Sequence, residues 1–245
     1  MSTLIPIDET IGEARTGMNF LDRVREVQHR EPTNELERVL HQYSCANSTE
    51  LLDIVVDNWP VLRSASLLEE AFIEAWSTQK FGIPHWSLSF CRDFFTLLDS
   101  RALRKAGDPL PAGDSFVVYR GVAGGRNQRR VRGYSWTGDQ DVAQLFAAIR
   151  SHQGFGGFGL PKPAVYSAVI REKDVFAYLD VSHRNEKEFL LRPEGLSKIR
   201  QVWPTAAARS RSFAPISCAS VMLLSVPISW LPFGPLVERA PAVLV

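Results

Sequence analysis

Cysteine is scarce in this sequence. Only three cysteines, Cys45, Cys91 and Cys218, occur among 245 residues, and they are far apart. An odd number of widely separated cysteines excludes a disulfide framework, and no cysteine or histidine pair has the spacing of zinc ligands. A chain of this length buries an adequate core without either device. We therefore expect no metal site and a reducing compartment, the cytoplasm.

Excess charge is also lacking. The chain carries 28 basic and 27 acidic residues, a formal net charge of +1. The overall balance therefore gives no support to nucleic-acid binding. Residues 1–17 are acidic and lack the long apolar stretch of a signal peptide, so we expect a cytoplasmic protein, or an effector delivered into a target cell by other means.

Residues 214–237 form a long stretch without a charged residue. The length suits a membrane span. However, prolines interrupt it repeatedly, and each would break a helix; they are Pro215, Pro227, Pro232 and Pro235. We interpret residues 201–245 as an apolar tail packed on the core, and we expect no stable membrane insertion.

The rest of the chain divides into a helical region, residues 1–110, and a strand-rich core, residues 111–200. Apolar residues recur at helical spacing in 34–43, 66–76 and 85–100. After the turn-rich segment 105–114, short apolar strands follow, with one helix among them at 139–150. The predicted strands are 115–121, 132–137, 164–171, 174–180 and 188–193. Helices first and strands afterwards predict an α+β fold, with a mixed β core and one embedded helix.

Two strand ends carry polar residues of interest. Arg120 ends the apolar run 116–119, and a buried arginine needs an anion or a hydrogen-bond network to receive it. Ser135 ends the next strand. Thr137 reads as the N-cap of the following helix, with Gln140 completing a capping box, which leaves Ser135 without a capping duty.

A third polar feature is the pair Glu186 and Glu188. Alternate strand residues face the same side of a sheet, so the pattern predicts that both carboxylates share a face and that Lys187 points away. A solvated strand edge is the alternative reading. The apolar run that follows favours a strand entering the core.

In this order, Arg120, then Ser135-Trp136-Thr137, then Glu186-Lys187-Glu188 resemble the R-S-E class of mono-ADP-ribosyltransferases. That class includes cholera-like and clostridial toxins and vertebrate ecto-enzymes. The resemblance covers about residues 115–195, and each of the three motifs stands on a predicted strand. It implies that NAD⁺ is a substrate and that no metal is needed.

The resemblance also implies roles. Glu188 would bond the ribose 2′-hydroxyl and stabilise an oxocarbenium-like transition state. Glu186 would orient and deprotonate the acceptor. Arg120 would hold ribose and phosphate oxygens of NAD⁺. The backbone of Gly121 would approach the nicotinamide amide, because no side chain intervenes. Ser135 would bond the ribose or Glu188.

Further predicted NAD⁺ contacts come from Trp136 and Thr137 and from two loops. Phe155 or Phe158 stacks on nicotinamide, or their glycine-rich segment is a surface hairpin. His183 and Arg184 lie where relatives carry a substrate-recognition turn. They contact the acceptor, or they are simply solvated.

The Glu-x-Glu pattern favours arginine of a target protein as the acceptor. RNA or DNA is the alternative acceptor, because four arginines in residues 126–133 could attract a phosphate backbone. A non-catalytic NAD-binding module is a second alternative, and a helical interaction protein is a third. The class suggests a bacterial or phage toxin or effector, with an antitoxin or chaperone docked on the apolar tail.

Overall fold

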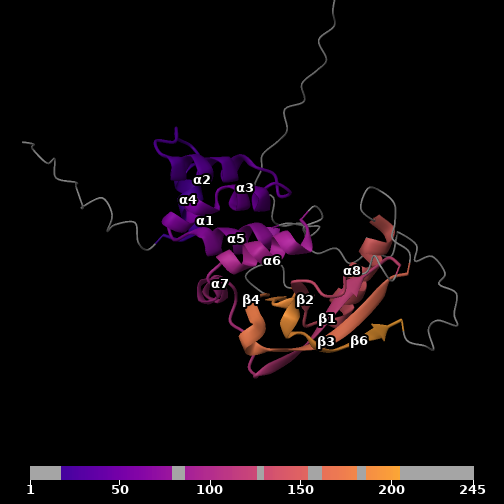
Figure 1. Ribbon diagram of the computed structural model, residues 1–245. Helices are drawn as coiled ribbons and strands as arrows, with labels where there is room; N and C mark the ends of the chain where they lie inside the picture. The colour runs from indigo at the N-terminus through magenta and orange to yellow at the C-terminus, as the bar shows by residue number, and fades with distance from the viewer. Residues whose placement is uncertain (1–17, 79–85, 126–129, 154–161, 181–185, 205–245) are drawn as a thin grey trace, which may run out of the picture. The chain divides into compact units, whose positions relative to one another are not determined.

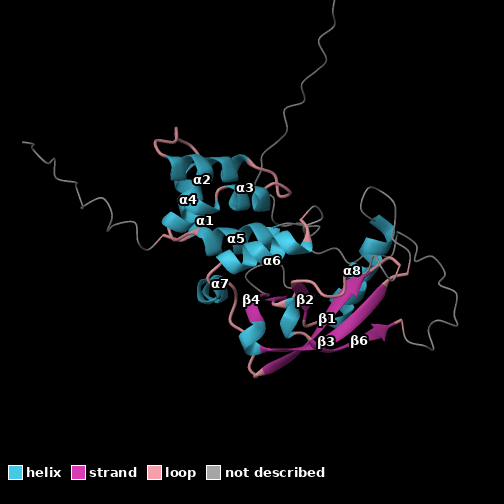
Figure 2. Cartoon of the chain, in the orientation of Figure 1, coloured by secondary structure: helices cyan, strands magenta, loops and turns pink. Residues whose placement is uncertain are grey.

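A computed structural model describes residues 18–78, 86–125, 130–153, 162–180 and 186–204 (Figure 1). The chain divides into two units, Met1–Thr205 and Ala206–Val245, and every described residue belongs to the first. In the described residues, seven helices precede a six-stranded sheet that has an eighth helix inserted in it (Figure 2). The predicted α+β class is confirmed.

The seven N-terminal helices are short, and four of them, α1, α2, α6 and α7, begin at a side-chain cap. Asn19 and Asn34 accept hydrogen bonds from backbone N–H groups in the first turns of α1 and α2, and Ser87 does the same for α6. The bounds are α1 Phe20–Val27, α2 Glu35–Cys45, α3 Leu51–Asp57, α4 Trp59–Ser64, α5 Leu68–Thr78, α6 Leu88–Leu97 and α7 Ser100–Ala106.

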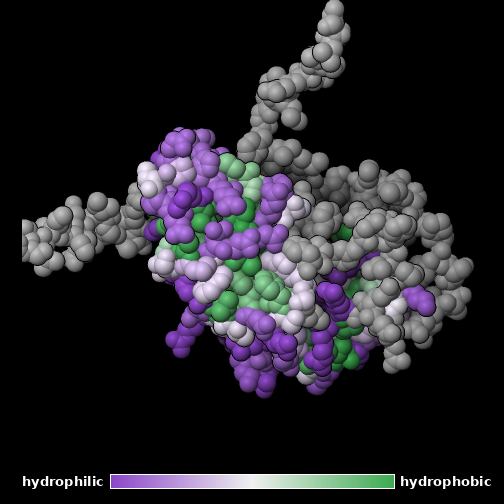
Figure 3. Space-filling view, turned by 45° about the horizontal axis from the view of Figure 1, so that its top comes forward, coloured by the Kyte–Doolittle hydropathy of each residue, from purple (hydrophilic) through white to green (hydrophobic). Residues whose placement is uncertain are grey.

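Aromatic side chains form the centre of this helical region. Phe72 on α5 contacts both Phe94 and Phe95 on α6, at ring-centroid distances of 5.7 and 5.4 Å. The same cluster of buried residues continues into the sheet through Tyr134 and Phe176. On the face shown in Figure 3, hydrophilic side chains predominate over the helices, and hydrophobic ones show in patches between them. The helices and part of the sheet therefore share one buried cluster.

The sheet has the strand order β4-β5-β2-β1-β3-β6. Its strands are β1 Ser115–Val122, β2 Ser135–Thr137, β3 Ala164–Arg171, β4 Val175–Leu179, β5 Glu188–Leu191 and β6 Ser197–Trp203. The sequence predicted a mixed core, whereas all five pairings among the described strands are antiparallel. Parallel neighbours in one sheet need crossover connections, and the one α-helix that lies between strands in the described residues joins β2 to β3, which are not neighbours.

Strand β6 was not predicted. It crosses the boundary between residues 200 and 201 that the sequence placed between core and tail. Four of its seven residues are polar, none is fully buried, and Lys198 has a positive φ of 51°. An edge strand of this kind carries little of the apolar alternation by which strands are recognised.

Helix α8, Gln140–Gln153, packs against β1 at very close range. A Cβ atom added to Gly121 would lie 2.0 Å from the carbonyl oxygen of Ala143 and 2.6 Å from the nitrogen of Ala147. Glycine and alanines therefore let the helix backbone rest on the strand backbone. This contact holds α8 over the strand that carries Arg120.

We predict that Gly121→Ala lowers the free energy of unfolding by about 3 kcal/mol, because the new methyl group meets backbone that cannot rotate away. Urea unfolding measures the change. Gly138→Ala is the control: its Cβ would meet a Phe189 side-chain atom at 3.3 Å, and the expected loss is below about 1 kcal/mol. Equal losses in the two variants would contradict this account of the α8 contact.

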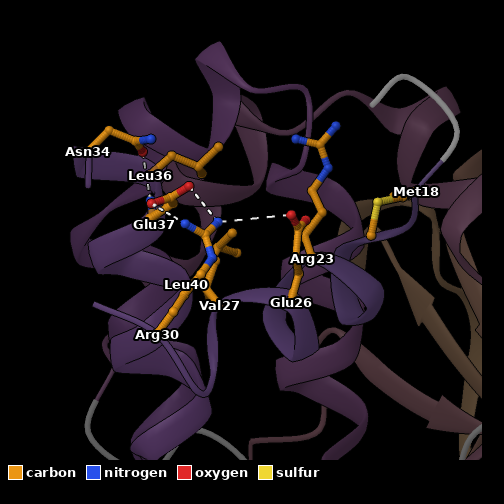
Figure 4. A pocket seen from close by; sticks show the side chains of 9 residues that line it. All are labelled: Met18, Arg23, Glu26, Val27, Arg30, Asn34, Leu36, Glu37 and Leu40. Carbon is orange, nitrogen blue, oxygen red and sulfur yellow. Dashed lines mark hydrogen bonds and ion pairs between the residues drawn. The ribbon is translucent and has the colours of Figure 1, made fainter. Parts of the chain in front are cut away.

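A small surface pocket lies between α1 and α2 (Figure 4). Within it, Arg30 donates to both oxygens of Glu37, at 2.7 and 3.2 Å, and lies 3.9 Å from Glu26. The hydroxyl and the backbone N–H of Thr33 also donate to Glu37, at 2.7 and 2.8 Å. The carboxylate is thus satisfied from within the pocket, and no predicted site residue lines it.

These bonds make Glu37 a source of pH-dependent stability. Hydrogen bonds from Thr33, and then the Arg30 guanidinium, lower the pKa of Glu37 from 4.5 to about 2. A carboxylate with a lowered pKa in the folded state stabilises the fold above its unfolded pKa. We predict that wild type is more stable than Glu37→Gln at pH 7 and that the difference shrinks as pH falls from about 4.5 to about 2.

Denaturant midpoints measured across pH test this prediction. Glu35→Gln serves as the control, because it removes an exposed negative charge from the same first turn of α2. A gap between wild type and Glu37→Gln that stays constant down to pH 2 would show that the carboxylate is not held as described.

No helix in the described ranges is long and apolar enough to cross a bilayer. The apolar segment 214–237 lies outside those ranges.

Candidate active site

Glu188 is a carboxylate placed inside the protein. It opens β5, its residue is 5% exposed, and it pairs with Thr137 of β2. The hydroxyl of Ser135 donates to Glu188 Oε1 at 2.5 Å, and Nε1 of Trp76 donates to the same oxygen at 3.1 Å. Because a buried charge is costly without such donors, these two bonds are what allow the carboxylate to stay there.

Sequence reasoning missed Trp76. It lies 112 residues before Glu188, on α5, where an aromatic residue at helical spacing reads as core. No local pattern carries information about that contact. Ser135 and Glu188, in contrast, were both singled out, and the structure brings them together.

Arg120 supports the same group of residues from β1. Its Nη1 donates to the backbone oxygen of Ser135, and its Nε donates to the backbone oxygen of Arg130 at 3.1 Å. These two carbonyl groups accept the hydrogen bonds that the half-buried Arg120 needs. They also tie the strand that carries Ser135 to the strand that carries Arg120.

Burial lowers the pKa of the Arg120 guanidinium to about 9. The charge of Arg150 acts in the same direction, the charge of Glu188 opposes it, and the charge of Arg130 adds a smaller lowering. Arg120 therefore still carries its positive charge at neutral pH, in surroundings that disfavour it.

Gly133 makes room for Arg120. A Cβ atom on Gly133 would lie 2.6 Å from Nη2 of Arg120 and 2.7 Å from its Cζ. The guanidinium thus packs directly on the glycine backbone, two residues before Ser135. The sequence showed this glycine only as the start of a strand, so its role was not predicted.

Arg150, on α8, is a second cation of the site that sequence reasoning missed. It is half-buried, and burial lowers the pKa of its guanidinium. In the described part of the chain its side chain makes no hydrogen bond or ion pair, while its charge acts on Arg120. Two partly desolvated guanidinium groups near each other favour a bound anion.

Thr137 was predicted to cap helix α8, and that prediction is wrong. Asp139 is the cap, since its Oδ1 accepts from the backbone N–H of Asp141 at 2.9 Å. Thr137 ends β2. Its hydroxyl donates to the backbone oxygen of Glu186 at 2.6 Å and accepts from the N–H of Asp139 at 3.0 Å. Thr137 therefore holds the segment that carries Glu186.

Trp136 was predicted to contact NAD⁺, and the structure corrects this as well. It lies between Ser135 and Thr137 on a strand, so its side chain points to the opposite face of the sheet. There it is 1% exposed, belongs to the core, and donates from Nε1 to the oxygen of Gly133 at 2.9 Å. A side chain buried in this way is not available to a ligand.

The alternation argument for Glu186 and Glu188 also needs correction. Strand β5 begins at Glu188, and Lys187 has a left-handed φ of 48°, so Glu186 lies before the strand. Its orientation is set by this turn. Glu186 is half-buried, and its backbone oxygen accepts a hydrogen bond from Thr137. The neighbouring Lys187 forms an ion pair with Asp139, with 3.6 Å between Nζ and Oδ2.

For Gly121, the structure supplies a reason other than the predicted one. The direction in which its side chain would point is filled by α8, so helix packing by itself requires a glycine there. The remaining predicted residues, Phe155, Phe158, His183 and Arg184, lie outside the described residues.

Taken together, these residues define an α+β chain in which strands and the helical region hold one buried carboxylate near two desolvated arginines. Within the described ranges, no three His, Cys, Asp or Glu side chains are grouped so that they could hold a metal ion. Comparisons of the chain with protein-family models, curated proteins and solved structures found no match.

Proposed function

We propose that the chain is an NAD⁺-dependent mono-ADP-ribosyltransferase, of the toxin or effector kind, that modifies an arginine side chain of a target protein. One observation carries the proposal. Arg120, Ser135 and Glu188, drawn from three strands, are joined by hydrogen bonds that run from Arg120 to the backbone of Ser135 and from its hydroxyl to Glu188. These are the residues in which the sequence resembles the R-S-E transferases.

In the proposed reaction, the bond between C1′ of the ribose and the nicotinamide nitrogen breaks. The bonding electrons leave with nicotinamide, which becomes neutral, and positive charge develops on the ribose. A fixed carboxylate beside the ribose stabilises that charge without having to reorganise. Glu188 is suited to this role because Ser135 and Trp76 hold it in place.

The pyrophosphate of NAD⁺ is assigned to the arginines. Arg150 has no ion-pair partner within the described residues, and its charge acts on the desolvated Arg120. A dianion bound at these guanidinium groups would offset the repulsion between them. This assignment makes α8 part of the NAD⁺ site.

Glu186 is assigned to the acceptor. It lies ahead of the buried strand and is more exposed than Glu188, as a group that must meet a second substrate should be. As the new bond forms between the acceptor nitrogen and C1′, Glu186 would take the proton that the guanidinium nitrogen loses.

The arginine-rich segment gives less support to a nucleic-acid acceptor than its composition suggested. Arg132 donates to the backbone oxygen of Pro193 at 3.0 Å, and Arg130 offers its backbone oxygen to Arg120. In the described part of this segment, Arg130 and Arg132 therefore make hydrogen bonds within the protein. RNA or DNA remains an outcome that the experiment below can return.

We predict that Glu188→Gln lowers the rate of NAD⁺ consumption by at least about 100-fold, because an amide cannot supply the negative charge that the ribose cation requires. The measurement uses ³²P-labelled NAD⁺ in cell lysate. Glu172→Gln, which alters an exposed carboxylate in the turn that follows β3, is the control and should leave the rate unchanged. Equal NAD⁺ consumption by wild type and Glu188→Gln would refute the catalytic proposal.

The same assay identifies the acceptor. Label that is released by protease names protein as the target, and label that is released by RNase names RNA. Glu186→Gln should retain NAD⁺ hydrolysis and lose transfer, since it acts only on the acceptor. Loss of NAD⁺ without labelled macromolecules in wild type would point to a glycohydrolase or to a small-molecule acceptor.

We predict that Arg150→Gln raises the KM for NAD⁺ about ten-fold and changes kcat by less than about three-fold. A pyrophosphate bond is made equally in the ground state and the transition state, and one charged hydrogen bond has about this value. Arg25→Gln, at an exposed arginine paired with Asp22, is the control. An unchanged KM in Arg150→Gln would remove Arg150 from the NAD⁺ site.

A further inference from the structure

Trp76 donates a hydrogen bond to Glu188 from outside the three motifs. It lies on α5, it is 8% exposed, and its Nε1 donates to the same Oε1 atom that Ser135 uses. A buried indole N–H needs an acceptor, and a nearby backbone oxygen suffices for Trp136, whereas Trp76 uses a site carboxylate 112 residues away. The pairing therefore calls for an explanation beyond packing.

The chemistry of the indole suits it to fix a carboxylate. A serine hydroxyl both donates and accepts and can rotate, so Ser135 by itself permits several arrangements. The indole N–H only donates, and its direction follows the ring. Because the indole can only donate, its bond fixes Oε1 of Glu188 as the acceptor and fixes the direction from which that oxygen is approached.

The ring itself is held by an aromatic cluster. The ring of Trp76 packs against Phe72 at 5.6 Å and edge-on against Phe95 at 6.1 Å between centroids. Phe95 also stacks on Tyr134, with centroids 4.3 Å apart and ring planes 4° from parallel. Tyr134 directly precedes Ser135, so a single cluster positions both donors to Glu188.

We infer that Trp76 is a positioning residue for Glu188, and that through it the helical region, α5 and α6 in particular, is a working part of the active site. This inference rests on the proposed function, in which Glu188 stabilises the ribose cation. Trp76 acts through Glu188 and is assigned no contact with substrate.

The chain offers a matched control. Trp86 is 7% exposed, also lies in the helical region, and its Nε1 donates at 3.2 Å to Oδ1 of Asp53, which is not a predicted site residue. Trp76→Phe and Trp86→Phe each keep an aromatic ring and remove one indole bond to a carboxylate. The full chain carrying either change is assayed for kcat and KM with NAD⁺, beside wild type and Glu188→Gln.

We expect Trp76→Phe to lower kcat about ten-fold, the effect of one lost hydrogen bond to a charged group, with the KM for NAD⁺ within about two-fold. Trp86→Phe should lose a similar amount of thermal stability and keep its kcat. Turnover that needs Glu188 but is indifferent to Trp76→Phe overturns the positioning role alone. Absence of any Glu188-dependent turnover in wild type overturns the proposed function, and the positioning role with it.

A second measurement applies if Trp76→Phe does not fold. The indole N–H resonances of wild type and Glu188→Gln are compared by ¹H–¹⁵N NMR, with signals assigned by ¹⁵N labelling at single tryptophans. The Trp76 resonance should shift in Glu188→Gln while the Trp86 resonance stays in place. A Trp76 resonance that does not move would show that the bond is absent in solution and would overturn the inference.

Discussion

The burial of one carboxylate, that of Glu188, is the constraint on which the rest of the site depends. A charged group that is 5% exposed persists only if donors reach it, and two donors converge on one of its oxygens. One comes from the neighbouring strand and the other from the helical region. Each part of the fold is thus required to keep this charge inside, and neither part forms the site without the other.

Strand β2 meets this requirement with three residues. Ser135 and Thr137 lie on one face, where they hold Glu188 and the backbone of Glu186, while Trp136 on the other face anchors the strand in the core. Arg120 secures the strand from β1 by its bond to Ser135. Packing and site chemistry are therefore assigned to alternate side chains of the same short element.

The positive charges of Arg120 and Arg150 set a second constraint on the site, beside the negative charge of Glu188. Burial lowers the pKa of both Arg120 and Arg150, and the charge of Arg150 lowers the pKa of Arg120 further. The carbonyl groups that receive Arg120 offset part of this cost, and Gly133 provides the space in which the guanidinium lies. In the proposed function, this pair would receive the anion of NAD⁺, beside the carboxylate that would stabilise the ribose cation.

From the sequence alone, the periodicity of apolar residues determined the α+β class and five of the six strands, and local motifs singled out Arg120, Ser135 and Glu188. These are signals carried by neighbours along the chain. The sequence did not predict the roles of Trp76, Gly133 and Arg150 or the cap at Asp139. Its predictions for Trp136 and Thr137 were wrong. The cap is a local contact between Asp139 and Asp141, but the roles of Trp76 and Gly133 depend on contacts across 112 and 13 residues of chain, and only tertiary packing decides those.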